Sequence, residues 1–231
     1  MDPHASEARH PWDGGPRRVE PVFAASIRAM DLWVRARFDI RVEGLWHIPG
    51  AGPVLLAPNH VSYADPVVMG ALAHRAGRRL RAVAIASVFE VFFVGWVLRR
   101  SHQIPIDRNH SRPALETARN ALRGGEAVLL YPEGSIVRGG ERLDARAGVG
   151  LLALDSRVPV IPVASAGLEP LQRRSIARRR AGVVIGPPVD LSAVRQERGR
   201  HAARRAATVV LDTVRSQLPA ARDLAGLPAR A

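Results

Sequence analysis

The first candidate for chemistry in this chain is a histidine followed five residues later by an aspartate. His60 and Asp65 lie in the stretch APNHVSYADP, between an apolar run and a helical pattern. A turn from a strand into a helix can fold the two side chains toward each other. A carboxylate bonded to an imidazole fixes its tautomer, so that the other ring nitrogen can act as a base near neutral pH. The pair therefore indicates general-base chemistry.

Both residues also have ordinary structural interpretations. Asp65 precedes Pro66, and an aspartate before a proline at the first helical position is a common N-cap arrangement. A histidine in a loop is often satisfied by backbone groups alone. His102 and Asp107 have the same spacing, but they flank a predicted strand, where an odd offset places side chains on opposite faces. Of the two matches, only His60 and Asp65 are expected to form a pair.

Two more polar segments follow predicted strands. The stretch YPEGS at 131–135 ends an apolar run, and IPIDR at 104–108 places Arg108 just beyond another. Sites in α/β proteins gather in the loops at the carboxyl ends of strands. Pro-Glu-Gly is also typical of a simple turn, and a lone arginine is usually solvated, although an arginine fork suits phosphate. Each segment alone is a weak signal.

Apolar runs of strand length alternate with helical patterns through most of the chain. Strands are expected at 53–57, 81–86, 103–106, 127–131, 158–164 and 181–186, and helices at 66–76, 88–99, 112–123, 146–156 and 192–218. A further helix over 21–38 is amphipathic, with apolar residues every three or four positions and arginines between them. This alternation predicts an α/β fold: a single domain with a mixed, mostly parallel sheet covered by helices on both faces.

The two ends of the chain have a different composition from its middle. Residues 1–20 are charged and broken by Pro and Gly, without the apolar core of a signal peptide, and predict a flexible arm. Residues 21–218 form the predicted domain, and 219–231 a flexible tail. The longest apolar stretch, 82–98, is shorter than the ~20 residues that a membrane span requires, so no span is expected.

Charge and composition exclude several classes of protein. The 231 residues include 34 basic and 21 acidic side chains, a net charge of +13, and all the counted basic residues are arginine because lysine is absent. This charge favours anionic partners: acidic lipid, phosphorylated substrate or nucleic acid. Aromatic residues make up only 5% and the arginines are scattered, so no nucleic-acid partner is expected. The absence of cysteine excludes disulfides, thiolate metal sites and a cysteine nucleophile.

In their order along the chain, these segments resemble the sequence blocks of the 1-acylglycerol-3-phosphate acyltransferases, a family of lysophospholipid acyltransferases. Asn59-His60-x4-Asp65 is similar to the first block, and the stretch at 104–108 to a second block that ends in arginine. The stretch at 131–135 resembles the block Phe-Pro-Glu-Gly-Thr, and VPVIPV at 158–163 resembles a fourth, a proline-containing strand. The resemblance covers residues 22–218.

The resemblance implies transfer of a fatty acyl group from acyl-CoA or acyl carrier protein to the free hydroxyl of 1-acylglycerol-3-phosphate, which gives phosphatidic acid. It implies His60 as the base and Asp65 as the residue that orients it, with direct attack by the hydroxyl and no acyl-enzyme. The implied substrate-binding residues are Asn59, Arg108, Glu133, Gly134, Ser135 and Arg138. Neither a cofactor nor a metal is implied.

One position departs from the family. Ile136 stands where the family usually has an arginine thought to meet the acceptor phosphate, and isoleucine cannot bind an anion. Arg138 or Arg146 could supply that charge instead. The alternatives are a lysophospholipid acceptor with another head group, a lyso-aminolipid acceptor, or a basic nucleic-acid- or lipid-binding protein without catalysis.

The expected location is the cytoplasmic face of the cell membrane, with peripheral attachment. The helices over 21–38 and 88–99 carry arginines beside apolar and aromatic residues, as helices that lie in the membrane interface do. The densest basic cluster, RRSIARRR at 173–180, is expected as a solvated loop or as a contact with acidic lipid head groups. An anionic membrane surface is thus an expected partner.

Overall fold

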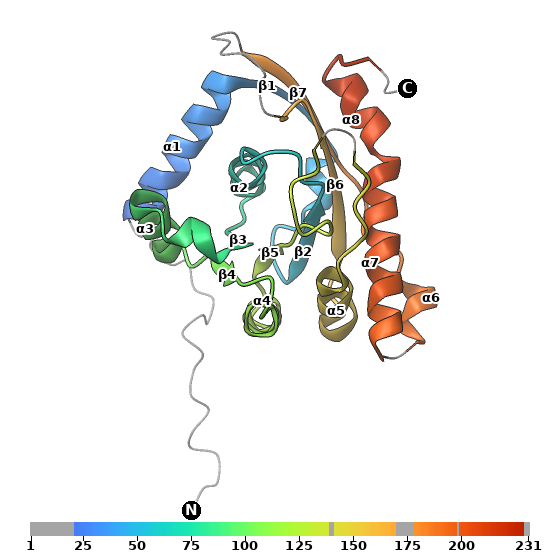
Figure 1. Cartoon of the computed structure of the whole chain (residues 1–231). Helices are drawn as coiled ribbons and strands as arrows, with labels where there is room; N and C mark the ends of the chain where they lie inside the picture. Colours follow the sequence, from blue (N-terminus) through green and yellow to red (C-terminus); the bar gives the residue numbers. More distant parts are fainter. Residues whose placement is uncertain (1–20, 139–140, 170–177, 198, 229–231) are drawn as a thin grey trace, which may run out of the picture.

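One twisted sheet forms the centre of the molecule (Figure 1). The computed structural model describes residues 21–228, apart from 139–140, 170–177 and 198. Within these residues the sheet has seven strands in the order β1-β7-β6-β2-β5-β3-β4, and only the β6–β7 pair is antiparallel. The strands are β1 (Phe38–Glu43), β2 (Val54–Pro58), β3 (Leu80–Ile85), β4 (Ile104–Ile106), β5 (Ala127–Leu129), β6 (Val160–Ala166) and β7 (Arg179–Ile185).

Helices pack on both faces of this sheet (Figure 1). They are α1 (Pro21–Arg37), α2 (Asp65–Arg75), α3 (Phe92–Arg100), α4 (Arg112–Arg123), α5 (Ala147–Ser156), α6 (Ser192–Arg195), α7 (Gly199–Ser216) and α8 (Leu218–Leu224), with short 3-10 turns η1 (Leu45–His47) and η2 (Ala86–Phe89). Buried side chains from α4, α5 and α7 share one core cluster, and those of α1 and α2 share another. The arrangement confirms the predicted α/β class with a mixed, mostly parallel sheet.

The central strand β2 shows why the sequence selects this fold. All five of its residues are buried, as expected for a strand covered on both faces. Because side chains alternate along a strand, Leu55 joins the core under α4, α5 and α7, whereas Val54 and Leu56 join the core under α2. The parallel neighbours β5 and β6 lie on its two sides. The loops that follow β2 and β5 therefore begin side by side, at the carboxyl ends of two neighbouring parallel strands.

The amino-terminal part of the domain differs from the expectation. The helix predicted over 21–38 ends at Arg37, and Phe38 begins the strand β1, which the sequence analysis missed. The six residues FDIRVE alternate strictly between apolar and polar side chains, a pattern typical of a half-buried strand. Phe38 fits both the helical period before it and the strand period after it. The predicted flexible arm, residues 1–20, lies outside the described residues.

The carboxyl-terminal part also needs correction. The continuous helix predicted over 192–218 is divided into α6 and α7, and the segment from Pro219, expected as a loose tail, contains α8. Ala221 of α8 is fully buried against β7, where Gly182 leaves room for it: a Cβ on Gly182 would lie 2.0 Å from the Ala221 carbonyl oxygen. Proline in the first turn begins this helix rather than ending the fold. Residues 229–231 lie outside the described part.

Candidate active site

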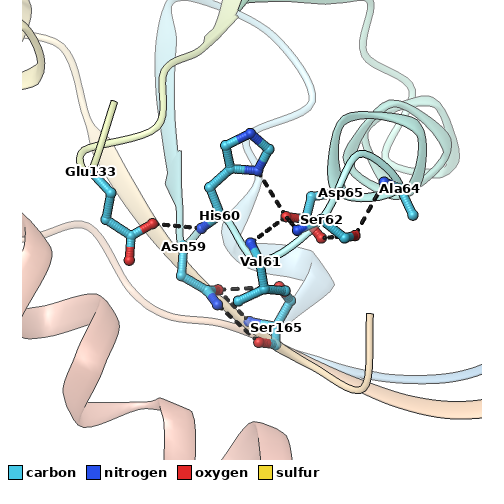
Figure 2. A network of polar contacts seen from close by, with 8 residues as sticks. All are labelled: Asn59, His60, Val61, Ser62, Ala64, Asp65, Glu133 and Ser165. Atoms are coloured by element: carbon cyan, nitrogen blue, oxygen red, sulfur yellow. Dashed lines mark hydrogen bonds and ion pairs between the residues drawn. The ribbon is translucent and has the colours of Figure 1, made fainter. Parts of the chain in front are cut away.

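His60 and Asp65 face each other across the loop that leads from β2 into α2 (Figure 2). The imidazole Nδ1 lies 2.9 Å from Asp65 Oδ2. The Asp65 side chain is fully buried, whereas the His60 side chain remains 15% exposed. Because a carboxylate only accepts hydrogen bonds, Nδ1 carries the proton and donates it to Asp65. Nε2 is left as the nitrogen that can accept a proton.

Three further donors hold the Asp65 carboxylate in place. The backbone N–H groups of Val61 and Ser62 donate to Oδ2 at 2.6 and 2.9 Å, and the Ser62 hydroxyl donates to Oδ1 at 3.0 Å. All of these donors precede Asp65 in the chain. The helix α2 has Ala64 at its N-cap, with no side-chain capping bond. The interpretation of Asp65 as a helix cap alone is therefore wrong, because its side chain organises the histidine loop instead.

Tyr131 fixes the plane of the His60 ring. The two rings are stacked, with centroids 3.9 Å apart and planes 19° from parallel. Tyr131 is buried just beyond β5, and its hydroxyl has no hydrogen-bond partner among the described residues. Burial, with the neighbouring Asp65 and Glu133 carboxylates, raises the pKa of Tyr131 well above its ordinary value. The phenol therefore stays neutral, and its ring provides a flat apolar surface against the His60 imidazole.

Glu133 holds the histidine from the other side. Figure 2 shows Glu133 and Asp65 on opposite sides of His60, and Glu133 Oε2 accepts the His60 backbone N–H at 2.6 Å. The carboxyl group is buried, and burial raises its pKa to about 7, although the bond from His60 and the charge of Arg215 oppose that shift. Because the Glu133 carboxyl is hydrogen-bonded to the His60 backbone and not to its ring, Glu133 fixes the conformation of the loop that carries His60.

The two loops at this edge of the sheet are joined through the main chain of His60. The His60 carbonyl accepts the Val137 N–H at 2.7 Å, while its N–H is held by Glu133. Between these two bonds lie Gly134, which is exposed, and Ser135, which is half-buried. Gly134 has a left-handed φ of +67°, and the N–H of Gly134 donates to the Tyr131 carbonyl at 3.1 Å. The segment 133–137 therefore lies directly beside the base.

Asn59 has its side chain directed at the sheet. Its amide nitrogen donates to the Ser165 carbonyl at 3.0 Å, and its Oδ1 accepts the Ser165 N–H at 2.7 Å and hydroxyl at 3.1 Å (Figure 2). Asn59 is buried, so these bonds connect the end of β2 with β6. The side-chain bonds of Asn59 described above all go to Ser165 and none goes to the His60 ring, which supports a positioning role for Asn59.

The two arginines expected at the site differ in their distance from His60 along the fold. Arg108 follows β4, which is three strands away from β2, or about 14 Å at the usual strand spacing. Arg138 follows Val137, whose N–H binds the His60 carbonyl. Both side chains are exposed, and within the described part of the chain neither guanidinium has a mapped hydrogen bond or ion pair. Both are therefore available to a ligand.

The second histidine–aspartate spacing has a different structure. Asp107 accepts the Asn109 N–H at 2.8 Å and lies 3.2 Å from His110 Nδ1. His102 lies at the end of α3 with a left-handed φ of 56°. The turn around His60, and not the five-residue spacing itself, brings a histidine and an aspartate into hydrogen-bond contact.

Sequence reasoning missed three residues that shape the site: Tyr131 as a ring partner, Ser165 and Arg215. Arg215 lies near the end of α7 and donates to the Leu143 carbonyl at 2.5 Å. Tyr131 begins the stretch YPEGS, but nothing in that stretch indicates ring stacking, and Ser165 is 106 positions from Asn59, so no local pattern connects the two. In residues 21–228, outside the gaps, no group of three or more His, Asp or Glu side chains could hold a metal ion.

The comparisons with known proteins agree with this geometry. Residues 39–166, more than half of the chain, match the sequence model of the Acyltransferase family. The chain therefore belongs to the Acyltransferase family.

Its relatives share a narrower name. A 1-acyl-sn-glycerol-3-phosphate acyltransferase alpha from Bos taurus is 26% identical over 180 residues, which are 74% of this chain and 62% of the bovine protein. The corresponding enzyme of Bacillus subtilis is 22% identical over 163 residues, 70% of this chain and 79% of that protein. The chloroplastic LPAT1 of Arabidopsis thaliana is 23% identical over 134 residues, only 36% of its length. The match thus spans less than two thirds of the bovine and Arabidopsis proteins.

A solved structure shares the fold. The crystal structure of the 1-acyl-sn-glycerophosphate (LPA) acyltransferase PlsC from Thermotoga maritima superposes with a TM-score of 0.64, covering 90% of this chain and 82% of that chain. The two sequences are 20% identical, so the likeness concerns the fold.

Proposed function

We propose that this protein transfers a fatty acyl group from an acyl thioester to the free hydroxyl of 1-acylglycerol-3-phosphate and so forms phosphatidic acid. The observation that carries the proposal is the buried Asp65 carboxylate bonded to Nδ1 of His60, which leaves Nε2 as the base. The names of the relatives from Bos taurus, Bacillus subtilis and Thermotoga maritima support this acceptor. The donor is acyl-CoA or acyl carrier protein.

The proposed mechanism is a direct attack in one enzyme-bound complex. Nε2 of His60 removes the proton of the acceptor hydroxyl while its oxygen bonds to the thioester carbonyl carbon. The carbon–sulfur bond then breaks, and the imidazolium returns its proton to the departing thiolate. The Asp65 carboxylate stabilises the imidazolium, and positioned general-base catalysis of this kind supplies about 10²–10⁴-fold in rate.

The lipid acceptor is proposed to arrive from a membrane. Large apolar side chains are exposed on the neighbouring helices α1 and α3, namely Leu32, Trp33, Val91, Phe92, Phe93, Val94 and Trp96. Arg99 and Arg100 end α3, and the Arg100 guanidinium lies 5.9 Å from the centre of the Trp96 ring. Apolar and aromatic side chains beside arginines suit the interface of an anionic bilayer.

The proposal is for peripheral attachment, at the cytoplasmic face. Among the helices of the described residues, none combines the length and hydropathy needed to cross a bilayer. The basic cluster at 173–180, for which lipid contact is one expectation, is described only from residue 178 onward.

The deciding experiment measures release of free thiol from acyl-CoA and from acyl carrier protein in the presence and absence of 1-acylglycerol-3-phosphate. Thiol release that requires the acceptor, with phosphatidic acid as the product by mass spectrometry, is the expected result. Acylation of only another lyso-lipid would replace the acceptor and keep acyl transfer. Rapid hydrolysis without acceptor, or a trapped acyl-enzyme, would contradict direct attack.

A further inference from the structure

The side chain of Arg146 lies directly against Gly134. Gly134 belongs to the loop at 131–137, here called the catalytic loop. A Cβ on Gly134 would lie 2.7 Å from Arg146 Cγ, 3.5 Å from its Nε and 3.6 Å from its Cδ. Any side chain at position 134 would therefore displace the Arg146 stem. Gly134 follows Glu133, which holds the backbone of the base His60. The Arg146 stem thus lies against the residue that follows Glu133, the residue that holds the His60 backbone.

The backbone around Arg146 is fixed at two points. The Arg146 N–H donates to the Pro132 carbonyl at 2.8 Å, which joins the segment to the catalytic loop. Three residues earlier, the Leu143 carbonyl accepts a bond from Arg215 of α7. The helix α5 begins at the next residue, Ala147, so Arg146 is also held by the helix that follows it. The position of Arg146 is therefore set by the framework of the domain.

The guanidinium of Arg146 is available for an anion. The residue is exposed, and in the part of the chain that the structure describes no carboxylate forms an ion pair with it. The Glu133 carboxyl in the loop that Arg146 contacts already accepts the His60 N–H, and burial raises its pKa to about 7. An uncompensated arginine fork whose stem lies on the loop that holds His60 is suited to a phosphate monoester.

We propose that Arg146 binds the phosphate of the acceptor. It would take the place of the arginine that the family usually has at the position of Ile136. The inference rests on the proposed function and assigns one of its binding residues. Gly134 is required at its position because it leaves room for the Arg146 stem. The three atoms nearest to a Cβ at position 134 all belong to Arg146, and none belongs to Arg138 or Arg108.

The test compares Arg146→Met with wild type on two acceptors, 1-acylglycerol-3-phosphate and the monoacylglycerol that lacks its phosphate. Methionine keeps an unbranched apolar stem on Gly134 and removes the charge. The KM for the phosphate-bearing acceptor should rise about 10- to 100-fold. The KM values for acyl-CoA and for monoacylglycerol should stay unchanged. Arg146→Lys, which retains a charge, should lie between wild type and Arg146→Met.

Two further variants make the test specific. Arg142→Gln removes an exposed arginine four residues away on the same segment and should behave as wild type. Adding Ile136→Arg to Arg146→Met should recover much of the lost affinity, because it restores a cation at the family's position. Matching thermal unfolding midpoints confirm that the compared proteins are folded.

The outcomes separate the two levels of the proposal. Wild type that acylates neither acceptor refutes the proposed function, and the assignment of Arg146 falls with it. Wild type that uses the phosphate-bearing acceptor while Arg146→Met matches Arg142→Gln refutes the inference alone. An equal loss on both acceptors, or a phosphate-specific loss in Arg138→Gln instead, also overturns it.

Discussion

The phenol ring of Tyr131 lies parallel to the imidazole of His60, with 3.9 Å between the ring centroids. The Nδ1–Asp65 bond fixes one edge of the imidazole, and the stacked ring limits its tilt. The direction of Nε2 is therefore set by two contacts from different loops. Tyr131 acts as a positioning residue for the base.

Changing Tyr131 separates this stacking from the phenol hydroxyl. Tyr131→Phe should keep kcat within about twofold and should not lower stability, because the buried hydroxyl has no mapped partner. Tyr131→Leu should lower kcat about 10-fold or more with little change in KM, because the base loses its orientation. Steady-state kinetics and urea unfolding measure both effects. Equal kcat values in the two variants would show that the stack does not position His60.

The base itself is tested with His60→Ala and Asp65→Asn. Activity should fall at least about 10²-fold in each, by loss of the base in the first and of its orienting carboxylate in the second. Asp65→Asn should also lower the free energy of unfolding, because the buried carboxylate accepts bonds from Val61 and Ser62. His102→Ala is the control with the same spacing and should retain full activity. An active Asp65→Asn enzyme would remove Asp65 from the mechanism.

Glu133 predicts a pH-dependent stability. Its carboxyl titrates near 4.5 when unfolded and about 7 in the folded protein, where burial disfavours the charged form. Between these values the folded protein keeps a proton that the unfolded chain has released, so stability falls as pH rises through this window. Glu133→Gln, which is always neutral, should remove that part of the pH dependence, on the order of 2–3 kcal/mol between pH 4.5 and 7.

Urea unfolding of wild type and Glu133→Gln at several pH values checks this prediction. The variant should gain stability relative to wild type as the pH increases from 4.5 to 7. A difference that is constant with pH would show that the Glu133 carboxyl has an ordinary pKa.

We expect Arg78 to contribute to the stability of the fold and not to the acyl transfer reaction. Its guanidinium is buried at the opposite end of the sheet from His60 and donates to the carbonyls of Pro49, Gly52 and Gly125 at 2.8, 2.5 and 3.2 Å. Arg78→Ala should lower the free energy of unfolding by about 2–4 kcal/mol, since three carbonyls lose a charged donor. Activity at low temperature should persist. The exposed Arg75→Ala is the control and should change stability by less than about 0.5 kcal/mol.

The apolar face of α3 predicts vesicle binding. Phe92, which is 92% exposed, and Phe93 should enter the interface, so Phe92→Ser with Phe93→Ser should reduce co-sedimentation with anionic vesicles. High salt should weaken the binding of wild type because arginines contribute. Trp46→Ser removes an exposed aromatic residue outside α1 and α3 and serves as the control. Equal sedimentation of all three proteins would exclude α3 as the membrane contact.

The parts of this molecule that the sequence predicted are those with a local signal. Strands such as β2 and β6 are continuous apolar runs, and the turn around His60 follows from a strand end beside a helix start. The strand β1 was missed because Phe38 completes the helical pattern of α1 and hides the alternation that follows. The helix α8 was missed because its buried residue Ala221 carries almost no hydrophobic signal and depends on the absence of a side chain at Gly182.

The site shows the same division. The pairing of His60 with Asp65 is local and was predicted, and local donors hold the carboxylate, but further contacts to His60 and Asn59 come from elsewhere in the chain. Glu133, Tyr131 and Ser165 lie at the ends of β5 and β6, and only the order of strands in the sheet brings them to His60. Sequence spacing carries no information about such contacts unless the strand order is already known.

The pairing of β1 with β7 has a consequence for how the chain folds. β1 occupies the edge of the sheet and pairs only with β7, with Phe38 opposite Arg179. Its partner therefore emerges from the ribosome on the order of 140 residues later, a separation typical of slowly formed contacts. Until then the alternating strand FDIRVE has an unpaired edge on both sides. During synthesis β1 is therefore open to pairing with the same strand of a second copy.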